Sequence, residues 1–115
     1  MSLAVNLIIK ANTGNKETEE FEVYWSNITH NLNTMAYKAG IYGYCWRPDE
    51  MAIKQAKELI EPLQDGLNRL KKYPEYFKQF NSPNGWGLYI NFVSWVENYL
   101  EACKKYPNAF IEISR

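Results

Sequence analysis

Alternation of apolar and polar side chains at the start of the chain is the feature that most restricts its fold. Within residues 3–12, one side of an extended strand carries Leu3, Val5, Leu7 and Ile9, and the other carries Asn6 and Lys10. Residues 21–26 alternate in the same way. The intervening segment NTGNKETEE (12–20) is rich in turn formers, and Gly14 can adopt a positive φ. The pattern predicts an N-terminal β-hairpin.

The middle of the chain has helical spacing instead. A first helix is expected from Ile28, with Ser26 or Asn27 as its cap and Gly40 at its end. A long apolar stripe then runs from Ala56 to Leu70, and Pro62 inside it predicts a kink. The remaining helical segments are 74–80 (PEYFKQF) and 89–103, separated by the turn cluster 81–87 (NSPNGWG).

Residues 108–114 alternate again and predict a third strand, which is expected to lie beside the first. The order of elements indicates a single α+β domain over residues 1–115. We expect a small antiparallel sheet, formed by the N-terminal hairpin and the C-terminal strand, packed on one face by three to four helices. Its outer face would then present Ile8, Tyr24 and Phe110, a candidate surface for a homo-oligomer.

The charge balance limits the partners. Thirteen basic and thirteen acidic residues cancel, which argues against general nucleic-acid binding, because that affinity comes mainly from neutralised phosphates. A net charge near zero also favours self-association. No apolar run is long enough to cross a bilayer, and residues 1–12 lack the basic start of a signal peptide. We therefore expect a cytoplasmic protein.

The stretch NITHNLN (27–33) contains His30, the only histidine of the chain. On a helix beginning at Ile28, His30, Thr34 and Tyr37 would lie opposite the apolar stripe. Two readings stay open: a polar strip that faces a ligand pocket, or a solvated helix face.

Catalytic motifs are lacking. A nucleophilic pair of Cys45 with His30 would need an activated thiolate, yet Cys45 lies between Tyr44 and Trp46, where free cysteines behave as small hydrophobes. The ligand sets of zinc or iron sites are missing, as are the glycine fingerprints of phosphate and dinucleotide sites. We therefore predict no catalytic residue, no metal and no cofactor.

Recognition chemistry remains. Aromatic residues make up 16% of the chain, too many for a core of this size to hide easily. Rings stack on planar groups, amides pair with base edges, and arginine grips phosphate. The predicted ligand-binding residues are Asn27, His30, Asn31, Tyr42, Trp46, Arg47, Asn84 and Trp86. Trp86 in NGWG has a second interpretation, in which it only packs before the last helix.

Five segments stand out together: NITHNLNTMAYKAGIY (27–42), WRP (46–48), PEYFKQFN (74–81), NGWG (84–87) and YLEACKKYPNAFIEISR (99–115). With these segments the chain resembles a family of small uncharacterised proteins of bacteriophages, prophages and their bacterial hosts. The family has no established activity, so no residue inherits a role from it. The resemblance implies a protein of a bacterial cytoplasm and is consistent with a phage-encoded one.

The resulting expectation is a non-catalytic binding protein that holds a small polar or nucleotide-like ligand. By analogy with other small phage proteins, it would sequester a nucleotide signal of host antiviral defence. One alternative is a protein–protein interaction module that docks on a host or phage protein. Another is a small hydrolase or transferase that uses His30.

Overall fold

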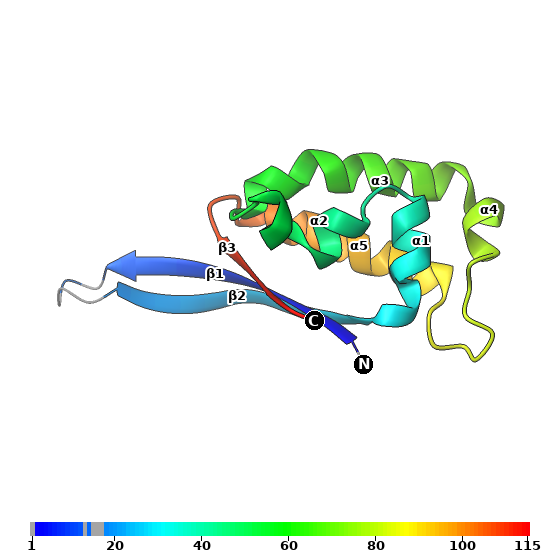
Figure 1. Cartoon of the computed structure of the whole chain (residues 1–115). Helices are drawn as coiled ribbons and strands as arrows, with labels where there is room; N and C mark the ends of the chain where they lie inside the picture. Colours follow the sequence, from blue (N-terminus) through cyan, green and yellow to red (C-terminus); the bar gives the residue numbers. More distant parts are fainter. Residues whose placement is uncertain (1, 13, 15–17) are drawn as a thin grey trace.

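The chain is an α+β protein in which helices cover one face of a three-stranded antiparallel sheet. Figure 1 is a computed structural model, and it describes residues 2–12, 14 and 18–115. The strands are β1 (Ser2–Asn12), β2 (Thr18–Thr29) and β3 (Phe110–Ser114). The α-helices are α1 (Asn33–Lys38), α2 (Tyr42–Trp46), α3 (Ile60–Lys72), α4 (Pro74–Lys78) and α5 (Tyr89–Lys105). The 3₁₀ helices are η1 (His30–Leu32), η2 (Pro48–Met51) and η3 (Ala56–Leu59).

The sheet has the strand order β2-β1-β3, so the C-terminal strand lies beside the first strand, as predicted. Pairing with β3 covers only Ala4–Ile8 of β1. The rest of the β1–β2 hairpin therefore projects beyond the helical layer (Figure 1), and the molecule measures 53 × 27 × 22 Å. Of the predicted loop 12–20, residues 13 and 15–17 lie outside the described part, and Gly14 has the expected positive φ of 87°.

The inner face of the sheet carries the alternation that the sequence predicted. Leu3, Val5 and Leu7 are completely buried, and the partly buried Ile111 and Ile113 of β3 pack against the same core. Tyr99 and Phe92 of α5 are the largest fully buried side chains. The core therefore lies between the sheet and α5, with α3 behind it.

A β-bulge corrects the predicted face of Tyr24. Leu7 pairs with Tyr24 but Ile8 pairs with Glu22, so Val23 is an extra residue in β2. The extra residue reverses the alternation. Tyr24 consequently points inward and stacks on Tyr99, with ring centroids 5.9 Å apart.

The neighbours of Tyr24 complete that correction. Trp25, paired with Asn6, lies on the outer face and is 54% exposed. Ile8 and Phe110 pair with each other, and Lys10 lies 4.7 Å from the Phe110 ring centre, which places both on the outer face as predicted. The predicted surface of Ile8, Tyr24 and Phe110 therefore loses Tyr24, its contribution from β2.

The first helix begins later than the sequence indicated. Asn27 and Ile28 belong to β2, where they pair with Ala4 and Leu3, and η1 then precedes α1. The cap is Thr29, whose Oγ1 accepts a hydrogen bond from the Asn31 N–H at 3.2 Å. Strand pairing together with the burial of Ile28 outweighs the local capping preference of Ser26 and Asn27.

Pro62 does not kink a continuous helix. Residues 56–59 form η3, and α3 begins at Ile60, so Pro62 lies in the first turn of α3. A proline is tolerated there because the first N–H groups of a helix have no partner inside it. The predicted apolar stripe is correct, since Ala56, Leu59, Leu63, Leu67 and Leu70 are all buried. Residues 41–50 show no helical period in the sequence, yet Tyr42–Trp46 form the short helix α2.

Candidate functional site

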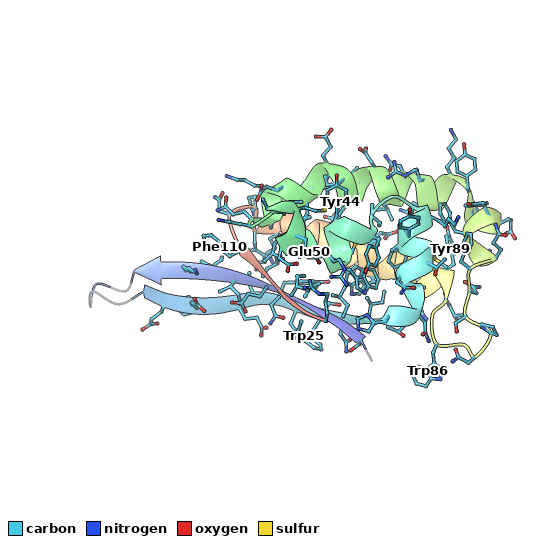
Figure 2. All side chains as sticks on the ribbon, in the orientation of Figure 1. Trp25, Tyr44, Glu50, Trp86, Tyr89 and Phe110 are labelled. Carbon is cyan, nitrogen blue, oxygen red and sulfur yellow. The ribbon has the colours of Figure 1, made fainter. Side chains whose placement is uncertain are left out.

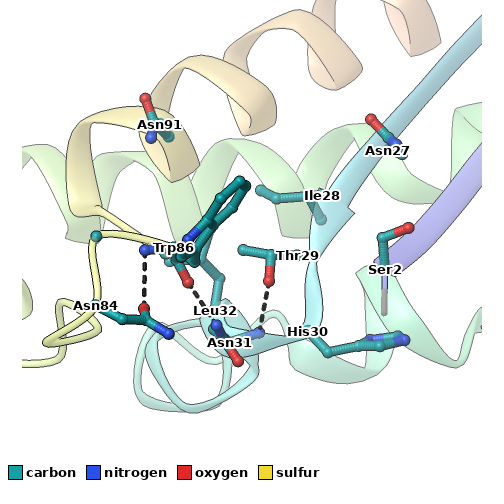
Figure 3. A pocket seen from close by; sticks show the side chains of 12 residues that line it. Ser2, Asn27, Ile28, Thr29, His30, Asn31, Leu32, Asn84, Trp86 and Asn91 are labelled. Carbon is teal, nitrogen blue, oxygen red and sulfur yellow. Dashed lines mark hydrogen bonds between the residues drawn. The ribbon is translucent and has the colours of Figure 1, made fainter.

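A cleft of about 840 Å³ lies between the end of β2 and the turn that precedes α5 (Figure 3). Five of its lining residues were predicted from the sequence as ligand-binding: Asn27, His30, Asn31, Asn84 and Trp86. The remaining lining residues are Ser2, Ile28, Thr29, Leu32, Gly85, Gly87 and Asn91. The fold thus brings together two segments that are more than 50 positions apart in the sequence.

Asn84 organises the turn side of the cleft. Its Oδ1 accepts hydrogen bonds from the Ser82 hydroxyl at 2.6 Å and from the Trp86 N–H at 2.9 Å. The Ser82 N–H donates to the Gly87 carbonyl at 2.8 Å and closes the loop. Gly85 and Gly87 have φ values of 78° and 136°, which residues other than glycine rarely adopt. The NGWG sequence therefore builds a defined turn.

Asn31 connects the two sides. Its Nδ2 donates to the Trp86 carbonyl at 2.7 Å (Figure 3). Gly87 approaches so closely that an added Cβ would lie 3.0 Å from the Asn31 Cβ. Within the described residues, the Asn31 Oδ1 and the Asn84 Nδ2 form no other hydrogen bond. One acceptor and one donor are therefore left for a ligand.

Trp86 is the most exposed ring of the cleft, with 71% of its surface accessible. It stands at the end of the turn, away from the helical layer (Figure 2). The interpretation that Trp86 only packs before the last helix is therefore incorrect. An exposed indole at the edge of a cleft offers a face for stacking.

His30 lies on the other side and is half-buried. Its Nδ1 accepts a hydrogen bond from the Trp46 Nε1 at 3.0 Å. Because an indole N–H can only donate, the Nδ1 of His30 accepts in this contact and carries no hydrogen. The N–H of the ring is then at Nε2. His30 thus presents a single N–H donor in the orientation that Trp46 fixes.

Three predicted ligand contacts lie outside the cleft. Trp46 is only 2% exposed, so it belongs to the core and cannot stack on a ligand. Tyr42 stacks on Trp46 with centroids 5.5 Å apart, and its hydroxyl accepts from the Arg47 Nε at 3.1 Å. Arg47 is ion-paired with Glu50, and the hydrogen bond to Glu50 raises the pKa of the guanidinium. The local sequence WRP could not reveal that α2 turns its rings inward.

The Cys45–His30 pair is not a reactive dyad. Cys45 is completely buried, and burial strongly raises the pKa of its thiol. The Nδ1 of His30 already accepts the hydrogen bond from the Trp46 Nε1. A thiol held neutral in this way is a poor nucleophile.

Sequence reasoning missed Ser2, Thr29 and Asn91. Ser2 faces the cleft because it pairs with Thr29, and the β1–β2 register is needed to find it. Asn91 lies in the first turn of α5, where its polar character among apolar neighbours was the only available signal.

Charge is absent from the cleft. Among its described lining residues there is no Lys, Arg, Asp or Glu. Within residues 2–12, 14 and 18–115, no group of three or more His, Cys, Asp or Glu side chains could hold a metal ion. The chemistry on offer consists of amides, hydroxyls, one imidazole N–H and one indole face.

Comparisons with protein-family models, with curated proteins and with solved structures give no match to this chain. None of the helices in the described part is long and apolar enough to span a membrane. The fold defines the class, α+β, and the site must be interpreted from its own chemistry.

Proposed function

We propose that this is a non-catalytic binding protein that holds a small polar ligand of the nucleobase or nucleoside type in the cleft. The observation that carries the proposal is the uncharged, amide-rich lining contributed by Asn27, Asn31, Asn84 and Asn91, with the exposed Trp86 beside it. Amide groups donate and accept in one plane, which suits the edge of a heterocycle. Base–aromatic stacking contributes roughly 1–3 kcal/mol in other binders.

The unused hydrogen-bonding groups support a planar ligand with alternating polarity. The Asn31 Oδ1 accepts, while the Asn84 Nδ2 and the His30 Nε2 donate. Each of these side chains is fixed by a second hydrogen bond, to Trp86, Trp46 or Ser82. Such preorganisation lowers the entropic cost of binding.

The ligand's charge is also constrained. Arg47, the predicted anion grip, is paired with Glu50 and does not line the cleft. A phosphate in the cleft would meet no cationic side chain among the described residues. In a nucleotide, and in the antiviral signal that the phage resemblance suggests, the base would therefore occupy the cleft while the phosphate stays in solvent.

Calorimetry and NMR titration with uridine, cytidine, adenosine and guanosine, each compared with its 5′-monophosphate, test the proposal. We expect one nucleoside to bind and its monophosphate to bind no more tightly. Trp86→Ala should weaken binding about 5- to 150-fold, the equivalent of about 1–3 kcal/mol of stacking. Tyr37→Ala is the matched control, because Tyr37 is also 71% exposed but lies outside the cleft. Absence of binding by all eight compounds, or equal loss in both variants, would contradict the proposal.

A protein–protein interaction module is the second candidate. Ile90, 68% exposed at the start of α5, lies four positions after Trp86, and large exposed apolar side chains are typical anchors of protein interfaces. A stoichiometric host partner captured by the wild type and by Tyr37→Ala, but not by Trp86→Ala, would favour this function, provided that no nucleoside binds.

A further inference from the structure

The two edges of the sheet differ in how they are covered. The edge of β3 is covered by residues 54–57: the Ile111 N–H donates to the Lys54 carbonyl and the Ala56 N–H to the Ala109 carbonyl, both at 2.9 Å. Beyond its pairing with β1, β2 forms no backbone hydrogen bond to another strand in the described part of the chain. Every second residue of an antiparallel strand turns its N–H and C=O away from its partner. The outer edge of β2 is thus an open row of donors and acceptors.

The open edge has two unlike halves. The projecting half, before the bulge at Val23, carries Glu19, Glu20 and Glu22. Charged side chains and bulges are the usual protection of an edge strand. The half after the bulge, residues 24–29 (YWSNIT), carries no charged side chain. This half is the unprotected part of the edge.

A groove of about 500 Å³ lies along the same half. It is lined by residues 23–26 of β2 and by Asn98, Glu101 and Lys105 of α5, among others. Tyr24 lines the groove, and its ring stacks on Tyr99 of α5, which packs β2 against that helix. The groove gives access to the unprotected edge.

We propose that a second copy of this chain occupies the edge, by antiparallel pairing of β2 with β2 around a two-fold axis at Ser26. The two three-stranded sheets would then form one continuous sheet. In this register Tyr24 lies opposite Ile28 on the inner face, Trp25 lies opposite Asn27 on the outer face, and Ser26 faces its own copy. An isologous contact requires such self-complementarity.

The bulge selects this register. Centring the axis on Tyr24 or Trp25 would extend the pairing across Val23, where the alternation reverses, and would place Glu20 or Glu22 opposite the buried Ile28. Centring it on Ser26 keeps the pairs within residues 24–28, and the first acid, Glu22, falls opposite His30. The overall neutrality of the chain adds no repulsion between copies.

Light scattering coupled to gel filtration, from micromolar to near-millimolar protein, provides the first measurement. We expect the mass to rise toward twice 13.5 kDa. Ser26→Lys should keep the circular dichroism of the wild type and remain a monomer, because it places like charges directly opposite each other. A monomer at every wild-type concentration would overturn the proposal, as would a dimer that Ser26→Lys leaves intact.

Cross-linking measures the register itself. Opposite residues of paired strands have Cα atoms about 4.5–5.5 Å apart, within the range of a disulfide. Ser26→Cys should therefore form a covalent dimer when oxidised with diamide. Asn27→Cys is the matched control, because its two copies would be diagonal neighbours. Cys45 and Cys103 are buried and contribute no background. Equal cross-linking of both variants, or none, would contradict the register centred on Ser26.

Discussion

The indole Nε1 of Trp46 donates a hydrogen bond of 3.0 Å to the Nδ1 of His30. The only histidine of the chain therefore links the core to the cleft, because Trp46 packs on Trp95 and Tyr42 while His30 lines the cleft. His30, which the sequence indicates as a candidate ligand-binding residue, therefore also has a structural role.

His30→Ala should lower the free energy of unfolding by about 1–3 kcal/mol, because it leaves a buried indole N–H without a partner. Thr34→Ala, an exposed change on the next helix, is the control and should have almost no effect. Chemical denaturation measures both. In a double-mutant cycle, Trp46→Phe should cost less in the His30→Ala background than in the wild type. Additive losses would show that the two side chains are not coupled.

Gly66→Ala should destabilise the protein even though alanine is the better helix former. Gly66 is buried within α3, and an added Cβ would lie 2.3 Å from the Cγ2 of the fully buried Ile41. Overpacking of this kind costs about 1–3 kcal/mol, more than the gain of about 1 kcal/mol in helix propensity. Thermal unfolding, with the exposed Asp65→Ala as control, provides the measurement. An increase in Tm for Gly66→Ala would refute the close packing of α3 on Ile41.

Gly87→Ala and Gly85→Ala form a matched pair at the cleft. Both glycines have positive φ, so each substitution strains the turn by about 1–3 kcal/mol. Only the Cβ at position 87 would press on Asn31, since nothing lies within 4 Å of one at position 85. We expect NMR chemical-shift changes at residues 29–32 in Gly87→Ala alone. Identical spectra of the two variants in that segment would argue against the contact.

Stability should fall in alkaline solution. Burial raises the pKa of the Cys103 thiol from 9.0 to about 12, and burial also raises the pKa of the Cys45 thiol and of the Tyr99 hydroxyl. Between its unfolded and folded pKa, each group binds more protons in the native state, so the stabilisation is complete below pH 9 and is lost as the pH rises. The slope is at most about 1.4 kcal/mol per pH unit for each group.

Urea denaturation between pH 7 and 10.5 measures that loss. Cys103→Ala should make the decline above pH 9 shallower, whatever it does to stability at pH 7. The same burial should keep both thiols unreactive toward a disulfide reagent at pH 8 until the protein unfolds. Rapid labelling of the native protein would contradict the burial of both cysteines.

The helix start at residues 27–33 shows where local reasoning stops. Asn27 and Ser26 are good capping residues, yet pairing with β1 carries β2 on to Thr29. The three rings of residues 42–46 were indistinguishable as core or site in the sequence, because a run without clear periodicity indicates no direction. The turn at residues 84–87 was predicted because turn chemistry is local. Its contact with Asn31 joins distant segments, so the local sequence does not indicate it.

The sequence by itself determined the α+β order of elements, the inner faces of β1, β3 and α3, and the NGWG turn, because these depend on periodicity and on residue-specific backbone preferences. Only the tertiary structure decided that the bulge at Val23 turns Tyr24 inward, that Trp46 is buried and that Arg47 pairs with Glu50. It also decided that the end of β2 meets the turn before α5 to form a cleft. These outcomes depend on strand register and on packing between distant segments, for which the local sequence contains no signal.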